Sequence, residues 1–225
     1  MPKHIILDLD NSIYSYDAPH QASMEAVFSE FQSLFGINRE ILKKSFAHAR
    51  MQTQLELPAR AASHNRLLYF QKMIEALGLN SLKYGLHFYN TYWETFLDRM
   101  ELDKDVKPML ESFHEKGMRI CLLTDLTAHI QFRKVEKFHL TELIYRMVSS
   151  EEVGVEKPHP YMFTKALQKL ECTAGEAIMI GDSWEKDIVG AQAMGIRSIW
   201  INRKNEIKDL PDSVQEVAHF NEIIL

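Results

Sequence analysis

The stretch HIILDLDNS (residues 4–12) decides how the chain is interpreted, because a short apolar run ends directly in two acidic residues. The apolar part is too short for a helix and is typical of a buried strand. Four further runs of this kind follow along the chain. We therefore predict five strands of a parallel sheet: residues 4–9, 118–123, 144–148, 177–180 and 197–201.

Helical patterns separate the later strands. Several of them end at a glycine or follow a proline, which are ordinary helix boundaries. The predicted helices are residues 106–116, 128–138, 161–170 and 185–194. Strands that alternate with helices are typical of a doubly wound α/β sheet, in which ligands bind beyond the carboxyl ends of the strands.

The interval after the first strand breaks this alternation. Segments 24–31, 67–77 and 88–97 place apolar residues three and four positions apart, as helices that pack on one another require. We expect residues 1–16 and 101–225 to form the α/β core domain and residues 17–100 an all-helical subdomain. An insertion at this point can act as a lid over the crevice.

Composition narrows the classes of partner. The 225 residues are 46% hydrophobic and 25% charged, with a formal net charge of −5. This balance provides no broad positive field for nucleic acid or anionic lipid. The apolar run 5–7 is too short for a signal peptide or a membrane span, so we expect a cytoplasmic protein without nucleic acid or membrane partners.

Asp8 and Asp10 are the first candidate site residues. Side chains two apart on an extended segment share a side, so we expect both carboxylates to project together unless the backbone turns between them. Such a pair in a low-dielectric crevice needs a cation or a shared proton, and a divalent ion is the natural choice. The alternative is two hydrated acids at a strand end. A calcium loop is excluded because Ile13 and Pro19 occupy its glycine and glutamate positions.

Two further segments follow strands. The Thr124 hydroxyl, with neighbouring backbone N–H groups, can hold a phosphoryl oxygen, or it can cap a helix. Lys157 precedes Pro158, which favours an extended backbone at the lysine. Its ammonium can neutralise phosphate charge, or it can be an ordinary solvated lysine.

The segment IMIGDSWEKD (residues 178–187) is the most specific of the four. Gly181 allows the backbone to turn sharply at the strand end. Asp182 then reaches the crevice as a further oxygen ligand for a metal, unless it is a helix cap. Asp187 lies about one turn into the helix, where it can orient Lys157 or a metal-bound water.

With these four segments in order, the sequence resembles the haloacid dehalogenase-like (HAD) hydrolase superfamily, in particular its phosphatase branch. The resemblance implies a Rossmann-like core, a helical cap inserted between the first and second motifs, and Mg²⁺ as cofactor. It implies that Asp8 is the nucleophile that forms an aspartyl-phosphate. Asp10 would protonate the leaving oxygen and then activate water, which calls for a raised pKa beside Asp8.

The resemblance assigns the remaining roles as well. Thr124 would bind the phosphate, and Lys157 would stabilise Asp8 and the transferring group. The metal set would be Asp8, Asp10 through its carbonyl, and Asp182, with Asp187 in support. Asp125 stands where the family more often has asparagine, so we expect its charge to point away from the substrate phosphate or to be paired.

The expected function is hydrolysis of a small phosphorylated metabolite, a phosphate ester, by a Mg²⁺-dependent phosphatase. A 5'-nucleotidase is the main alternative, and the motifs also leave phosphomutase and phosphonatase chemistry open. A 2-haloacid dehalogenase is disfavoured by Asp10, and a non-catalytic phosphate binder by the intact acid pair. In the insertion we expect Arg60, His64 or Arg66 to contact the leaving group, although the same segment is also compatible with a helix start capped by Ser63.

Overall fold

The computed structural model describes residues 2–225. The chain divides into two compact units, one formed by Met1–Ser15 with Glu101–Leu225 and the other by Tyr16–Met100. The sequence-based division placed Tyr16 in the first unit, so the observed boundary lies one residue earlier.

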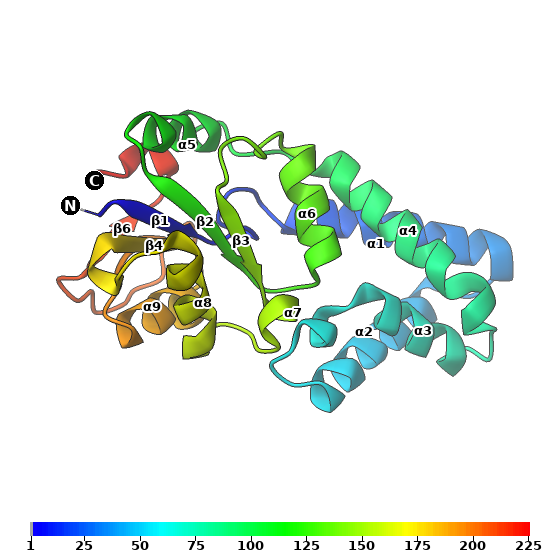
Figure 1. Cartoon of the computed structure of the whole chain (residues 1–225). Coiled ribbons are helices and arrows are strands. Elements are labelled where there is room, and N and C mark those ends of the chain that lie inside the picture. Colours follow the sequence, from blue (N-terminus) through cyan, green and yellow to red (C-terminus); the bar gives the residue numbers. More distant parts are fainter. Residues whose placement is uncertain (1) are drawn as a thin grey trace. The chain divides into compact units, whose positions relative to one another are not determined.

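The first unit is built on one parallel β-sheet with the strand order β3-β2-β1-β4-β5-β6 (Figure 1). The doubly wound α/β fold expected from the sequence is confirmed. The strands are β1 (His4–Leu7), β2 (Arg119–Thr124), β3 (Arg146–Ser149), β4 (Ala177–Gly181), β5 (Arg197–Ile201) and β6 (Val214–Val217).

The central place of β1 follows from its sequence. Ile5, Ile6 and Leu7 are fully buried. A parallel strand between two others, with helices over both faces, must be apolar throughout. Leu7 is in register with Leu122 of β2 on one side and with Ile180 of β4 on the other. The residues that follow these three strands therefore come out at one edge of the sheet.

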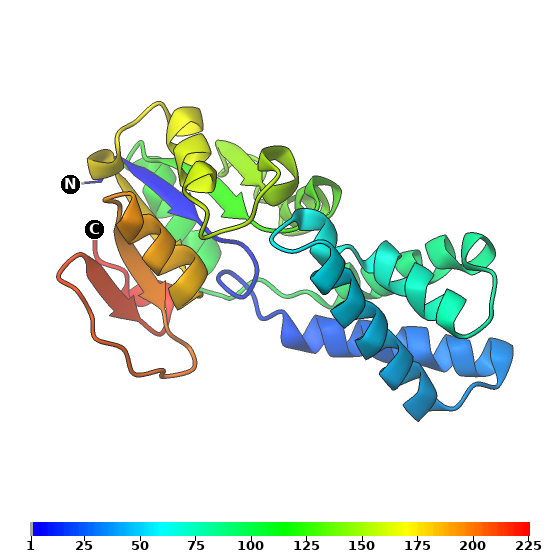
Figure 2. The same ribbon diagram turned by 90° about the horizontal axis from the view of Figure 1, so that it is seen from below.

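The edge strand β6 was not predicted. It pairs in parallel with β5, and Figure 2 shows it at the margin of the sheet. Its central residues Gln215 and Glu216 are polar and not buried, so the strand lacks the apolar run by which the other five were found. A strand at a sheet edge has one side free for solvent and tolerates such residues.

Helices cover both faces of this sheet. Helix α5 (Val106–Glu115) lies on one face, and α8 (Pro160–Leu170) and α9 (Val189–Ala193) lie on the other (Figure 1). The other helical elements of this unit are α6 (Ala128–Lys137), α7 (Ser150–Val153), η2 (Ala174–Glu176), η3 (Trp184–Ile188) and η4 (Phe220–Glu222). The single helix predicted for residues 185–194 is instead a π-helical turn, η3, followed by α9.

The second unit is entirely helical, as predicted. It consists of α1 (Asp17–Phe35), α2 (Arg39–Glu56), η1 (Ala61–His64), α3 (Arg66–Ala76) and α4 (Ser81–Arg99). Helices α1 and α4 pack side by side, and the Phe31 and Phe88 rings between them stack with their centroids 3.7 Å apart. Helix α3 begins after Asn65, whose side chain accepts a hydrogen bond from the Leu67 N–H at 2.9 Å, so the interpretation of Ser63 as its cap is wrong.

Within residues 2–225, no helix has both the length and the apolar character that a transmembrane span needs.

Candidate active site

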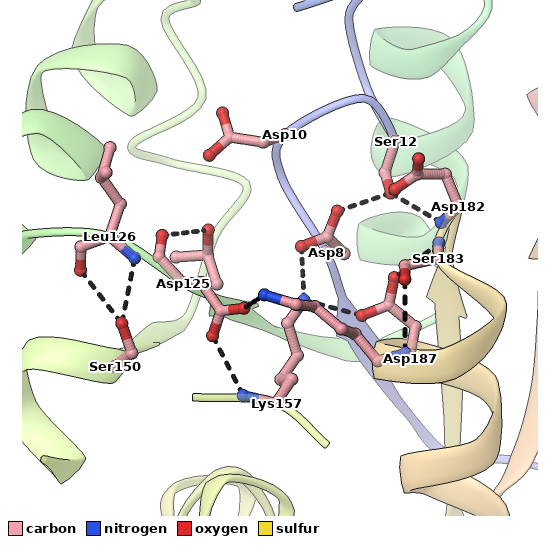
Figure 3. A network of polar contacts seen from close by, with 12 residues as sticks. Asp8, Asp10, Ser12, Asp125, Leu126, Ser150, Lys157, Asp182, Ser183 and Asp187 are labelled. Atoms are coloured by element: carbon pink, nitrogen blue, oxygen red, sulfur yellow. Dashed lines mark hydrogen bonds and ion pairs between the residues drawn. The ribbon is translucent and has the colours of Figure 1, made fainter. Parts of the chain in front are cut away.

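Four sequence segments meet at the carboxyl edge of the sheet. Lys157 Nζ lies 2.5 Å from Asp8 Oδ1 and 2.7 Å from Asp187 Oδ1 (Figure 3). The side chains of all three residues are less than a tenth exposed. An ammonium and a carboxylate at this depth remain charged only because they are paired. The structure therefore brings Lys157 to the first-motif acid, 149 residues away in sequence.

Acidic groups outnumber the basic group at this point. Carboxylate oxygens of Asp8, Asp182 and Asp187 all lie within 4.8 Å of one another. Ser12 connects two of these residues, because its hydroxyl donates to Asp8 Oδ2 at 2.7 Å and accepts from the Asp182 N–H at 3.0 Å. Three carboxylates facing one ammonium leave negative charge uncompensated. Hard oxygen donors with excess negative charge are what Mg²⁺ and Ca²⁺ bind, so the donor set fits a divalent cation.

The pKa values of these acids express the same imbalance. Burial raises the pKa of Asp8 to about 7, although Lys157 opposes the shift. Burial together with the neighbouring Asp8 raises the pKa of Asp182 to about 7. Burial also raises the pKa of Asp187. A bound dication would favour the charged forms and lower all three values.

Gly181 makes room for Asp187. A Cβ atom at Gly181 would lie 2.6 Å from the carboxyl carbon of Asp187, a distance that real side chains do not tolerate. The φ angle of Gly181 is not positive, so the glycine is not required there by a left-handed backbone but by the space that Asp187 fills. Asp187 is then fixed by the π-helical turn η3, where its Oδ2 accepts from the Ser183 N–H at 3.0 Å. Such turns often occur at functional sites.

Asp125 is paired, as its expected position beside a phosphate site requires. Its Oδ1 accepts from the Lys157 N–H at 3.1 Å, and its Oδ2 lies 2.8 Å from Lys186 Nζ. The carboxylate thus fixes the backbone of Lys157 while Lys186 balances its charge. Lys186 was not identified from the sequence.

Thr124 and Asp182 are not helix caps, which was the competing interpretation of each. The cap position of α6 is Thr127, and that of η3 is Ser183. Thr124 is fully buried at the end of β2, and its Oγ1 lies 2.6 Å from Gln131 Nε2. Its hydroxyl is therefore held at the same edge as Asp8.

Asp10 does not lie beside Asp8. Strand β1 ends at Leu7, Asn11 has a positive φ of 65°, and the Asp10 carboxylate points away from Asp8 (Figure 3). Its Oδ1 lies 2.5 Å from Lys134 Nζ. The two carboxylates therefore do not project together, and the exception allowed for, a turn of the backbone between them, is what the structure has.

The pKa of Asp10 also differs from the expected one. Burial alone would raise it, but Lys134 and hydrogen bonds from Tyr14 and Gln131 lower it below the usual range. The expected raised pKa is therefore wrong for this arrangement. Tyr14, Gln131 and Lys134 were not predicted. The only signal was the spacing of Gln131 and Lys134, three apart on one helix, which places both on one face.

The second unit holds Arg66 among aromatic rings. Its guanidinium carbon lies 5.4 to 5.9 Å from the ring centroids of Tyr16, Tyr69, Tyr92 and Trp93. Arg66 also donates to the His64 carbonyl at 2.5 Å and to the Tyr16 hydroxyl. Arg60 is exposed. Arg66 thus has a defined place within its own unit.

A carboxylate ion-paired with a buried lysine thus lies beside further acids at the carboxyl edge of a parallel sheet, which is where ligands bind in doubly wound α/β folds. A family model described as haloacid dehalogenase-like hydrolase matches residues 5–201. The chain belongs to this family.

Individual relatives cover nearly the whole chain. It is 35% identical to ribulose-1,5-bisphosphate 5-phosphatase of Halopiger xanaduensis, over 97% of this chain and 92% of the relative. It is 25% identical to glyceraldehyde 3-phosphate phosphatase of Methanopyrus kandleri, over 98% of this chain and 92% of the relative.

Solved structures share the fold. A HAD phosphatase from Thermococcus onnurineus superposes with a TM-score of 0.78 at 22% identity, covering 98% of this chain and 95% of that chain. A 2-haloacid dehalogenase from Pseudomonas syringae superposes with a TM-score of 0.77 at 23% identity, covering 99% and 96%.

Proposed function

We propose that this protein is a Mg²⁺-dependent phosphatase that hydrolyses a small phosphorylated carbohydrate through an aspartyl-phosphate on Asp8. The observation that carries the proposal is the pair between Lys157 Nζ and Asp8 Oδ1, 2.5 Å apart, inside a group of acids with excess negative charge. Such a site attracts a dication and presents an ionised carboxylate as nucleophile.

The reaction divides into two displacements. In the first, an Asp8 oxygen attacks phosphorus and the bond to the ester oxygen breaks, while the acidic proton of the substrate's phosphate monoanion passes through Asp10 to that oxygen. In the second, a water oxygen attacks the phosphoryl group, Asp10 takes the proton from the water, and the bond to Asp8 breaks to release phosphate. The lowered pKa of Asp10 favours its role as base in the second step.

Neighbouring residues offset the repulsion between the carboxylate and the phosphoryl oxygens. Lys157 neutralises charge on Asp8 and on the transferring group, and the Thr124 hydroxyl binds a phosphoryl oxygen. Asp8, Asp182 and the Asp10 carbonyl, with Asp187 in support, would hold Mg²⁺, which would supply further positive charge near the phosphoryl group. Asp125 contributes by holding the Lys157 backbone.

The substrate class comes from the relatives. Both of the relatives named above are, by their names, phosphatases of phosphorylated carbohydrates. A 5'-nucleotidase remains the alternative, because the motifs bind the phosphate and not the leaving group. The likeness to a dehalogenase, at 23% identity, concerns the fold alone, and an acid at position 10 favours phosphate esters.

The helical unit is proposed to be the cap, with Arg66 as the residue that contacts the leaving group. The Arg66 guanidinium is held by the His64 carbonyl, the Tyr16 hydroxyl and aromatic rings, and a guanidinium held by neutral groups can also bind an anionic or hydroxyl-rich ligand. Arg66→Lys keeps the charge but loses the planar donor set. We expect it to change the ranking of substrates by kcat/KM, with thermal unfolding as the check on packing.

The test of the proposed function is a substrate panel assayed with and without Mg²⁺. The panel contains ribulose 1,5-bisphosphate, glyceraldehyde 3-phosphate, other sugar phosphates and nucleoside 5'-monophosphates. We expect Mg²⁺-dependent release of phosphate, with the highest kcat/KM for a phosphorylated carbohydrate. Asp8→Asn should abolish turnover, and the variant should not gain the mass of a phosphoryl group when the intermediate is trapped. The control Asp98→Asn changes an exposed side chain of α4 and should have neither effect.

Two results would count against the proposal. A nucleotide preference would favour the nucleotidase alternative. No metal-dependent turnover on any ester, with tight binding of inorganic phosphate, would favour a non-catalytic binder.

A further inference from the structure

A second group of buried polar residues surrounds Asp10, separate from the Lys157 pair. Helix α6 contributes Gln131 and Lys134, both fully buried, and the loop after β1 contributes Tyr14. Burying a lysine costs free energy unless a negative charge compensates its own. The position of Lys134 beside Asp10 therefore indicates that the two side chains depend on each other as an ion pair.

The contacts engage both carboxylate oxygens of Asp10. Oδ1 lies 2.5 Å from Lys134 Nζ and accepts a hydrogen bond from the Tyr14 hydroxyl. Oδ2 accepts from Gln131 Nε2 at 2.9 Å. Three donors fix the orientation of the carboxylate, which points away from Asp8 (Figure 3).

This orientation suits the proposed reaction. In phosphoryl transfer the attacking and leaving oxygens are roughly in line on opposite sides of phosphorus. An acid that serves the leaving oxygen must therefore stand apart from the nucleophile, with room for the phosphoryl group between them. Proton transfer also needs a heavy-atom distance of about 2.6–3.2 Å, so a loosely held carboxylate would lose much of its effect.

Gln131 connects Asp10 to the phosphate-binding side. Its Nε2 lies 2.6 Å from Thr124 Oγ1 and 2.7 Å from the Asp125 carbonyl, besides its contact with Asp10. An amide nitrogen has two protons, so these three acceptors compete for them. A phosphoryl oxygen that engages the Thr124 hydroxyl changes this competition and hence the hold on Asp10.

We propose that Lys134 and Gln131 are positioning residues for Asp10: Lys134 anchors the carboxylate apart from Asp8, and Gln131 links its position to occupation of the phosphate site at Thr124. This inference rests on the proposed function, because it assigns a task to residues that act through the proposed acid and base.

The test is the dependence of kcat/KM on the leaving group. Glycerol phosphate, phenyl phosphate and p-nitrophenyl phosphate form a series in which the pKa of the leaving alcohol falls. The departure of the leaving oxygen therefore depends less on a proton from an acid. We expect Lys134→Met to lower kcat/KM about tenfold to hundredfold for the alkyl ester and less than about threefold for p-nitrophenyl phosphate. Gln131→Leu should show the same trend with a smaller loss, because it removes a neutral donor.

Lys137→Met is the matched control. It makes the same substitution on the same helix at an exposed position, and we expect it to leave the whole series unchanged. Lys134→Arg keeps the charge and should restore part of the alkyl-ester rate. A purely structural role of Lys134 would lower all three substrates equally and would overturn the proposal.

A double-mutant cycle with Asp10→Asn completes the test. If Lys134 acts through Asp10, Lys134→Met added to Asp10→Asn should lower the alkyl-ester rate by less than about a further twofold. Full additivity of the two losses would contradict the proposal. If Lys134→Met does not fold by thermal unfolding, Gln131→Leu provides the same cycle. Failure of the proposed function is a different result, because the wild-type protein would then show no Mg²⁺-dependent turnover in the first place.

Discussion

The two acids of the first motif each face a buried lysine, yet their surroundings differ in charge balance. Lys157 lies 2.5 Å from Asp8 but is shared with Asp187, and Asp182 lies nearby. Lys134 lies 2.5 Å from Asp10, where the other donors are neutral. The first pair is short of positive charge and fits a cation, whereas the second is balanced without one.

The pKa values of the two acids shift in opposite directions. Burial raises the pKa of Asp8 to about 7; Lys157 lowers it, but not by enough to offset burial together with the charges of Asp187 and Asp10. For Asp10 burial acts in the same direction, but Lys134 and its companions outweigh it and lower the pKa. Similar lysine–carboxylate distances therefore accompany pKa shifts in opposite directions, and the lysine beside Asp8 is also bound to a second acid, Asp187.

Among the substitutions that test this comparison, Lys157→Met has the largest expected effect. Removing the ammonium leaves Asp8 and Asp187 buried without their partner and the transferring group without its positive charge. We expect kcat/KM to fall by about 10²–10³-fold or more, by a similar factor for alkyl and p-nitrophenyl esters. Steady-state kinetics on the leaving-group series measure this.

The comparison with Lys134→Met sharpens the point, since that loss should depend on the leaving group. If Lys157→Met instead left the kcat/KM of the p-nitrophenyl ester unchanged, the assignment of Lys157 to the transferring group and of Lys134 to Asp10 would be wrong. Lys169→Met serves as control, because that lysine pairs with Glu152 away from both acids.

Gly181→Ala comes next in expected size. The new Cβ would lie 2.6 Å from the Asp187 carboxyl carbon, so the acid that Lys157 shares with Asp8 must move. We expect a loss of about 1–3 kcal/mol in the free energy of unfolding and a marked fall in kcat/KM. Chemical denaturation and steady-state kinetics measure the two effects.

Gly175→Ala is the matched control, because its Cβ would meet no atom within 4 Å and its φ is not positive. Equal stability of the two alanine variants would show that Asp187 does not need the space at Gly181.

The pH dependence of stability without metal separates the two acids further. Asp8 and Asp182 have folded pKa values of about 7, above the ordinary value near 4, so the folded state binds more protons between these limits. Their contribution to stability is present at low pH and is lost as pH rises from about 4 to 7. Asp10, with its lowered pKa, acts oppositely: its contribution is present above the ordinary pKa and is lost as pH falls through the folded one.

We expect the melting temperature in EDTA to decline as pH rises toward 7, and Mg²⁺ to reduce this decline. Asp182→Asn should also reduce it in EDTA. Thermal unfolding from pH 5 to 8 provides the measurement, and identical profiles with EDTA and with Mg²⁺ would argue against a metal at these acids.

The sequence predicted the fold and the candidate site best where an apolar strand pattern ends in a polar or acidic residue. Short apolar runs that end in Asp8, Thr124 and Asp182 predicted both the strands and the edge at which they meet. The sequence was uninformative where polar residues sit within a helix, because Gln131 and Lys134 resemble the solvated face of any amphipathic helix. Their burial depends on Asp10, which is 124 residues from Lys134 in sequence. A local sequence pattern cannot predict a contact over that separation.

The smallest expected effect is that of Asp125→Asn, which restores the residue more common in the family. Asparagine keeps a side-chain oxygen for the Lys157 N–H, so the backbone of the lysine stays fixed. It loses the ion pair with Lys186, whose side chain is 39% exposed, and such pairs contribute about 0–1 kcal/mol. We expect stability to change by no more than that and kcat/KM by less than about threefold, as measured by thermal unfolding and steady-state kinetics.

Asp125→Leu distinguishes the two contacts, since it removes the acceptor for the Lys157 N–H as well. It should lower kcat/KM clearly more than Asp125→Asn, because an unpaired N–H frees the segment that carries the lysine. If the two variants behave alike, the hydrogen bond to Lys157 does not position the ammonium. The charge balance on the Asp8 side would then depend on the side chains of Lys157, Asp8 and Asp187 alone.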